Sequence, residues 1–226
     1  MGRTAGWDLG ARRLYLCVPD RPDLEHFLAA CITGGVDLVQ LREKDLDDDR
    51  LVRRARLARR VCADHGVPFV LNDRPDLAEV VGADGVHVGQ EDASAAEARR
   101  VVGGGALVGL STHAVRELEV ATREAAPVDY ISAGPVVPTP TKPGRTGTGL
   151  GYVTEAVGRS PWPVWVTGGV EPGSVGAMAA AGARHFVVVR WLTGADDPLT
   201  RARELRRAID DALEPAGAGG GAGAGA

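Results

Sequence analysis

The 226-residue sequence predicts a (β/α)8 barrel, an α/β fold in which eight parallel strands alternate with helices in a single domain. Three observations support this prediction. Eight short runs rich in β-branched residues recur along the chain, each run is almost wholly apolar, and segments with helical patterning lie between them. An apolar run suits a parallel strand that is covered on both faces. A doubly wound open sheet is the alternative architecture.

The segments between the predicted strands have the features of helices. After the second strand, apolar residues occupy one helical face and arginines occupy the other. Pro172 and Pro198 predict two further helix starts. We interpret the arginine face as a solvated surface, because no aromatic residues are interleaved with it as in a nucleic-acid patch. The strands are residues 14–18, 38–41, 69–71, 85–88, 107–110, 130–133, 164–167 and 186–189, and the two helical faces are Leu51, Ala55, Ala58 and Cys62 against Arg53, Arg56 and Arg60.

Composition and charge exclude several classes of protein. A net charge of -4 argues against broad nucleic-acid binding, which needs a basic surface. No run reaches the length of about 18 apolar residues expected of a membrane span, and the first residues lack the apolar core of a signal peptide. We therefore expect a cytoplasmic protein. Cys17, Cys31 and Cys62 lie in apolar sequence without metal-ligand spacing, which predicts reduced core residues.

The sequence also predicts how the chain is divided. We expect a flexible segment over residues 1–12, a catalytic barrel domain over 13–214 and a disordered tail over 215–226. The tail prediction rests on composition, because residues 216–226 are all glycine or alanine and offer nothing to bury.

Polar residues follow the predicted strands. In a (β/α)8 barrel the catalytic residues lie on the loops after the strands, at the carboxyl end of the barrel. These side chains should therefore converge on one rim. They are Gln40, Arg42 and Lys44; Asn72 and Asp73; Gln90, Glu91 and Asp92; Ser111 and His113; the loop from Thr139 to Arg145; Gly168 and Gly169; and Arg190.

Lysine is rare in this chain. Of its 26 basic residues only Lys44 and Lys142 are lysines, and the others are arginines. A sequence that uses arginine so widely has little reason to keep a lysine unless a compact, flexible ammonium is needed. Both lysines lie in predicted loops, which indicates a functional role.

Asp73 and Asp92 follow neighbouring predicted strands, with Asn72 and Gln90 as further oxygen donors. Oxygen-only ligands select a hard cation, and one or two carboxylates completed by water and substrate phosphate are typical of Mg²⁺. The alternative is that each acid caps the helix that follows it. Their adjacency on the rim favours the metal.

Basic residues on two sides of the predicted metal site indicate that an anion binds there. Arg42 and Lys44 on one side, with Lys142 and Arg145 on another, would surround a diphosphate. The loop from Thr139 to Gly144 and the pair Gly168-Gly169 offer hydroxyl and backbone N–H groups for a second phosphate. Two anion sites imply two phosphorylated ligands or one long one.

No dinucleotide fingerprint, Walker loop or serine elbow is present in the sequence. His113 is either a general base or a structural hydrogen-bonding group, and His87, within a strand, is predicted to lie in the core. The chemistry that fits is charge stabilisation, in which magnesium and cationic side chains hold a departing diphosphate.

Six ordered motifs resemble the thiamine-phosphate synthase family, over about residues 14–210. They are Gln40-Leu41-Arg42-Glu43-Lys44, Asn72-Asp73-Arg74, the run from Gly85 to Asp92, Gly109-Leu110-Ser111-Thr112-His113, Gly134-Pro135 through Thr139 to Gly144, and Gly168-Gly169-Val170.

The resemblance implies a Mg²⁺-dependent transferase that joins 4-amino-2-methyl-5-(diphosphooxymethyl)pyrimidine to 4-methyl-5-(2-phosphooxyethyl)thiazole, giving thiamine phosphate and diphosphate. It implies that Asp73 and Asp92 are metal ligands, and that Arg42, Lys44, Ser111 and Lys142 are catalytic. The pyrimidine diphosphate would be held by Gln40, Leu41, Arg42, Glu43, Lys44, Asn72, Ser111 and Lys142, and the thiazole phosphate by Thr139, Pro140, Thr141, Gly169, Val189 and Arg190.

One residue departs from the family pattern. Arg190 stands where the family commonly has a small serine, so a charged side chain replaces backbone-led phosphate binding there. Two other functions are considered. A related barrel isomerises the thiazole phosphate, with His113 as a base, and a catalytically silent barrel would only bind a phosphorylated metabolite. The expected partners are small molecules, and the sequence leaves homo-oligomer formation open.

Overall fold

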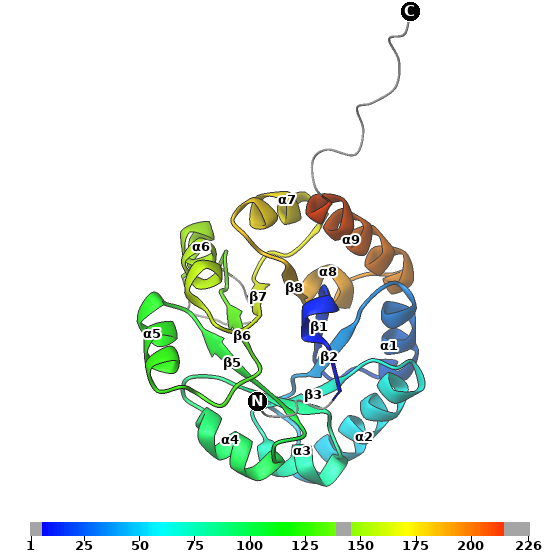
Figure 1. Ribbon diagram of the computed structural model, residues 1–226. Helices are drawn as coiled ribbons and strands as arrows, with labels where there is room; N and C mark the ends of the chain where they lie inside the picture. The colour runs from blue at the N-terminus through cyan, green and yellow to red at the C-terminus, as the bar shows by residue number, and fades with distance from the viewer. Residues whose placement is uncertain (1–5, 139–145, 215–226) are drawn as a thin grey trace, which may run out of the picture.

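Eight parallel strands form a closed barrel, in which each strand pairs with the next along the chain and β8 pairs with β1. The computed structural model describes residues 6–138 and 146–214. Figure 1 shows the strands at the centre and the helices in a ring around them. The predicted (β/α)8 barrel is confirmed, and the open sheet is wrong. The strands are β1 (Leu14–Val18), β2 (Leu38–Leu41), β3 (Phe69–Asn72), β4 (Gly85–Val88), β5 (Leu107–Thr112), β6 (Tyr130–Ala133), β7 (Val164–Thr167) and β8 (His185–Val188).

Two strands are longer than predicted, because polar residues at their carboxyl ends still pair with the neighbouring strand. β3 includes Asn72, which lies opposite His87 of β4, and β5 includes Ser111 and Thr112, which lie opposite residues of β6. β8 begins one residue earlier than predicted, at His185. An apolar composition therefore does not identify the strand residues at the carboxyl end of the barrel.

Some of the helices begin at a side-chain cap or at a proline that the sequence supplies. Asp47 accepts a backbone hydrogen bond at the start of α2, and Ser94 with Glu97 forms a capping box on α4. The predicted starts at Pro172 and Pro198 are confirmed. No helix in the described ranges is long and apolar enough to cross a membrane. The helices are the 3-10 helix η1 (Leu9–Ala11), α1 (Leu24–Thr33), α2 (Asp48–Asp64), α3 (Pro75–Val81), α4 (Ala95–Val102), α5 (Val115–Arg123), α6 (Gly149–Arg159), α7 (Pro172–Ala180), α8 (Arg190–Thr193) and α9 (Pro198–Leu213).

An outer apolar core lies between the strands and the helices. Outward-facing strand residues such as Leu16 and Val39 share this core with the predicted apolar face of α2. All three cysteines are buried thiols, as predicted. Burial raises the pKa of the Cys31 and Cys62 thiols to about 12, so both are inert core residues.

A second, smaller core fills the inside of the barrel with aromatic rings. The rings of Tyr15 and Trp165 meet edge to face with their centroids 5.3 Å apart, and those of Tyr15 and Tyr130 are 6.0 Å apart. Leu9 of η1 belongs to the same cluster. These side chains fill the axis of the barrel.

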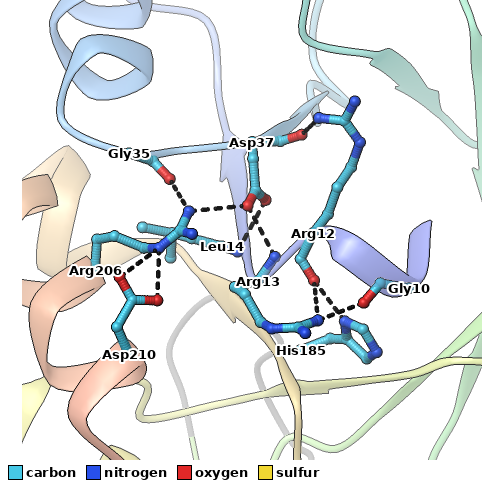
Figure 2. Close-up of polar contacts among 9 residues, drawn as sticks. All are labelled: Gly10, Arg12, Arg13, Leu14, Gly35, Asp37, His185, Arg206 and Asp210. Atoms are coloured by element: carbon cyan, nitrogen blue, oxygen red, sulfur yellow. Dashed lines mark hydrogen bonds and ion pairs between the residues drawn. The ribbon is translucent and has the colours of Figure 1, made fainter. Parts of the chain in front are cut away.

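A polar cluster at the amino-terminal end ties the first strands to the last helix (Figure 2). Asp37 accepts hydrogen bonds from the backbone N–H groups of Arg13 and Leu14 at 2.8 and 2.9 Å. The same carboxylate lies 3.1 Å from a guanidinium nitrogen of Arg206 in α9, and Arg206 also pairs with Asp210. Asp37 is therefore the acceptor that joins β1 to α9.

Replacing Asp37 by alanine is expected to lower the free energy of unfolding by about 3 kcal/mol, because two backbone donors and one guanidinium lose their acceptor. The matched control is Asp210→Ala, which removes the outer partner of the same arginine. The Asp210 side chain is 50% exposed, so the loss should stay below about 1 kcal/mol. Urea denaturation of both variants measures the difference, and equal losses would contradict the assignment.

Candidate active site

A cavity opens at the carboxyl end of the barrel. Side chains from most of the strands and from the loops after them line it, and several of the predicted site residues are among them. The lining residues are Tyr15, Cys17, Gln40, Arg42, Asn72, His87, Ser111, Ser132, Pro135, Thr167, Gly168, Val187, Val189 and Arg190. The predicted rim residues in this list thus lie at the end of the barrel where the cavity opens.

Gln40 and Arg42 stand on the β2 side of the cavity. The Gln40 amide is buried, donates to the Tyr15 hydroxyl at 2.6 Å and accepts from the Cys17 thiol at 3.3 Å. Arg42 continues the strand pairing through its backbone, and its side chain lines the cavity. Arg42 and Arg190 also line a second, adjoining cavity. Two guanidinium groups therefore face one region, which favours an anionic ligand.

The residues between these positions have different surroundings. Leu41 faces outward and is fully buried in the outer core. Glu43 accepts backbone hydrogen bonds from Asp20, Lys44 and Asp45. Burial raises the pKa of Glu43, but these three backbone donors outweigh it and leave the pKa below its usual value. The Leu41 side chain thus packs in the outer core and the Glu43 side chain holds the loop, and neither is part of the cavity lining.

Lys44, Asp73 and Asp92 meet at the rim. The Lys44 ammonium lies 2.9 Å from an Asp73 carboxylate oxygen. Asp73 has a left-handed backbone with φ 60°, and its N–H donates to the His87 carbonyl. That conformation is unusual outside glycine and costs roughly 1 kcal/mol. It is held by the neighbouring strand, and it places the Asp73 carboxyl group beside the Lys44 ammonium and the Asp92 carboxyl group.

The two carboxyl groups interact directly. Burial and the hydrogen bond to Asp92 raise the pKa of Asp73, while Lys44 lowers it. Burial also acts to raise the pKa of Asp92, but hydrogen bonds from Asp73 and the Gly89 N–H, with Lys44 and Arg42 nearby, leave it lowered. Neither acid caps its helix: α3 has no side-chain cap, and Ser94 caps α4.

This pair fits the predicted magnesium site. A hydrogen bond between two carboxyl groups requires a proton on one of them, and a divalent cation would replace that proton and hold both groups in their charged form. Across residues 6–138 and 146–214, no three His, Cys, Asp or Glu side chains gather as a metal cluster. A cation here would therefore have two carboxylate ligands and take the others from water and substrate, which suits Mg²⁺.

Amide and hydroxyl groups continue the cavity wall from β3 to β5. Asn72 is buried at the end of β3. Ser111 is buried in β5, and its hydroxyl lies 2.9 Å from Nε2 of His87. Gln90 donates from its side chain to the Ser111 carbonyl at 2.7 Å. Gln90 thus supports the strand that carries Ser111.

The loop after β7 approaches the loop after β6 closely. Gly168 and Gly169 have φ values of 93° and 78°, and a Cβ on Gly168 would overlap Pro135. Glycine is required at Gly168 both for its backbone angle and for space. Its backbone therefore lines the cavity near Val189 and Arg190.

Several predicted residues lie outside the described part of the chain. These are Thr139, Pro140, Thr141, Lys142 and Arg145. Of the two lysines, only Lys44 lies in the described part of the chain, and the roles of the other residues stay predictions.

The two histidines of the motifs have different surroundings. His113 lies beside Glu117 of α5, with Nδ1 3.1 Å from the carboxylate, and it is absent from the cavity lining. This favours the structural interpretation of His113. His87 is buried, as predicted, and also lines the cavity.

Sequence reasoning missed cavity residues that lie within the strands. Tyr15, Cys17 and Ser132 were counted as parts of strands, although each faces inward. An apolar run gives no sign of which residues face inward, because that depends on the register between strands. Because side chains alternate along a barrel strand, one residue known to face inward would identify the other inward residues of the same strand.

The closed barrel and the cationic, acidic and amide groups at its carboxyl end define the class as a (β/α)8-barrel protein with a polar, arginine-lined cavity. The sequence profile of the thiamine monophosphate synthase family matches residues 14–192. The chain belongs to this family, as predicted.

Individual relatives agree. The chain is 42% identical over 213 residues to the thiamine-phosphate synthase of Thermobifida fusca, covering 92% of this chain and 97% of the relative. It is 47% identical over 209 residues to that of Thermus thermophilus, covering 87% and 97%. A solved structure of a thiamine phosphate pyrophosphorylase from Pyrococcus furiosus superposes with a TM-score of 0.80 at 25% identity, covering 89% and 97%.

Proposed function

We propose that the chain is a magnesium-dependent transferase that condenses 4-amino-2-methyl-5-(diphosphooxymethyl)pyrimidine with 4-methyl-5-(2-phosphooxyethyl)thiazole, giving thiamine phosphate and diphosphate. Family membership and the names of the relatives support this reaction. The observation that carries the proposal is the contact of Lys44 with Asp73, beside Asp92. An ammonium next to paired carboxylates suits a site for a metal and a diphosphate.

The cavity divides into two parts in this proposal. Asp73 and Asp92 would hold Mg²⁺, which when bound neutralises charge on the diphosphate. Arg42 and Lys44 hold diphosphate oxygens, and Gln40, Asn72 and Ser111 orient the pyrimidine. The remaining proposed ligands are Lys142 and the backbone of Leu41 and Glu43 for the pyrimidine diphosphate, and Thr139, Pro140, Thr141, Gly169, Val189 and Arg190 for the thiazole phosphate.

The reaction needs charge stabilisation more than a nucleophilic side chain. The bond between the pyrimidine methylene carbon and the diphosphate oxygen breaks, and its electron pair leaves with diphosphate. The aminopyrimidine stabilises the resulting cation, and the thiazole nitrogen donates its lone pair to form the new carbon–nitrogen bond. Arg42 and Lys44 face the region where negative charge grows, so they favour the transition state over the bound substrate.

The test supplies both phosphorylated heterocycles to the purified protein and measures thiamine phosphate, with magnesium and with a chelator. We expect product and diphosphate in equal amounts with magnesium, and a return of activity when magnesium is restored. Absence of thiamine phosphate under all conditions would contradict the proposed function. Full activity in the chelator would contradict the metal requirement alone.

The alternative functions have less support. Isomerisation of the thiazole phosphate needs a base at the cavity, but His113 contacts Glu117 and is not part of the lining. A silent binding protein would have no use for a paired-carboxylate site beside Lys44. Incubation with the thiazole tautomer alone separates isomerisation from condensation. Location in the cytoplasm and formation of a homo-oligomer stay proposals.

A further inference from the structure

A chain of buried hydrogen bonds runs through the barrel beneath the cavity and joins two of its walls. The Gln40 amide nitrogen lies 2.6 Å from the Tyr15 hydroxyl, which lies 3.0 Å from the Tyr130 hydroxyl. The Tyr130 hydroxyl lies 3.2 Å from Nδ1 of His87, and Nε2 of His87 lies 2.9 Å from the Ser111 hydroxyl. All five side chains are buried.

The chemistry of the first link fixes the direction of the others. An amide nitrogen can only donate, so the Tyr15 oxygen accepts from Gln40. The hydrogen of Tyr15 then goes to its other partner, Tyr130, and the hydrogen of Tyr130 goes to Nδ1 of His87. Nδ1 must therefore be unprotonated, so the imidazole carries its hydrogen on Nε2 and donates to Ser111.

The opposite direction would leave a donor without an acceptor. If Tyr130 donated to Tyr15, the Tyr15 oxygen would accept twice, and its own hydrogen would meet no acceptor among the described residues. Such a buried donor is costly. Burial raises the pKa of both tyrosines well above the usual value, so each tyrosine keeps its hydroxyl hydrogen.

The protein makes space for this contact at Gly109. A Cβ built on this residue would overlap the hydroxyl end of Tyr130 and Nδ1 of His87. The two rings are also stacked, with centroids 5.5 Å apart. Because any larger residue at Gly109 would separate the two groups, the contact of Tyr130 with His87 is a built feature of the barrel.

We propose that Tyr130 and His87 are positioning residues that make Ser111 a hydrogen-bond donor to the substrate. The Ser111 oxygen accepts from His87, and Ser132 donates to it at 3.4 Å. Its own hydrogen is therefore directed to the cavity, which Ser111 lines. The ligand group that fits is an acceptor on the pyrimidine diphosphate, and only this assignment of the ligand rests on the proposed function.

The first test is made on the ligand-free protein by nitrogen NMR of labelled histidine. The chain has five histidines, and a His87→Gln variant identifies the His87 signals by their loss. We expect a single neutral form with hydrogen on Nε2. In Tyr130→Phe the acceptor nitrogen loses its donor, so we expect a mixture of tautomers.

The matched control is Tyr15→Phe, which removes a hydroxyl from the same chain but leaves the Tyr130 donor in place. It should keep the Nε2-protonated form. Hydrogen on Nδ1 in the wild type would overturn the proposal, and so would an unchanged tautomer in Tyr130→Phe. Thermal melting of both variants checks that they remain folded.

The second test asks whether Tyr130 acts through Ser111. Introduced into the wild-type protein, Tyr130→Phe is expected to lower kcat/KM by about 10-fold. Introduced into the Ser111→Ala variant, the same change should lower kcat/KM by less than about 2-fold. Equal losses in the two backgrounds would overturn the proposal. If the wild type forms no product at all, the proposed function fails, and the NMR result still decides the direction of the chain.

Discussion

Asp73→Asn and Asp92→Asn should each lower kcat/KM for thiamine phosphate formation by about 1000-fold, the largest effect expected in this protein. Each change removes one negative charge and keeps the size of the side chain. The two carboxyl groups share a hydrogen bond next to Lys44, so in the proposed function they form one site for the metal. Loss of either would then weaken magnesium binding and with it the charge stabilisation of departing diphosphate.

The measurement is kcat/KM over a range of magnesium concentrations. We expect that high magnesium partly restores activity, because the remaining carboxylate still binds the metal weakly. Asp76→Asn is the matched control, since Asp76 lies close in sequence but pairs with Arg74 and is 58% exposed. Wild-type turnover in Asp73→Asn or Asp92→Asn would rule out the metal site at these residues.

Lys44→Ala is expected to lower kcat/KM by about 100-fold. The ammonium lies at the rim beside Asp73 and is 52% exposed, so it is positioned to contact both the acidic pair and an entering diphosphate. Removing one preorganised charge that contacts the leaving group typically costs about 100-fold or more. We expect most of the loss in kcat, because the contact strengthens as the diphosphate separates.

Lys44→Arg tests the shape of the cation as well as its charge. A planar guanidinium does not reproduce the geometry of a compact ammonium, so we expect activity about 10-fold below that of the wild type. Arg60→Ala, which removes an exposed charge paired with Glu25 on the outside of the barrel, should have no effect. Normal activity of Lys44→Arg would contradict the argument from the rarity of lysine.

The apolar runs predicted the barrel because parallel strands in this fold are covered on both faces. The ends of β3 and β5 were missed, since Asn72 and Ser111 are polar and yet pair within the sheet. Burial by the helices selects apolar residues on the outer face of every strand. On the inner face the cavity allows polar residues, so composition stops indicating a strand there.

The site was predicted at the level of motifs more than of side chains. Residues 40–44 were predicted as one substrate-binding unit, but strand alternation directs Leu41 away from the cavity, and the Glu43 carboxylate binds loop N–H groups. Tyr15 and Tyr130 could not be predicted as partners, because they are far apart in sequence and meet only in the closed barrel. Pairing across a barrel depends on register, which local sequence does not specify.

The aromatic rings that fill the barrel axis limit the route by which ligands can enter and leave. Tyr15, Tyr130 and Trp165 are fully buried, or nearly so, beneath the cavity, so no ligand can pass through the barrel from one end to the other. Both substrates and both products must use the same opening.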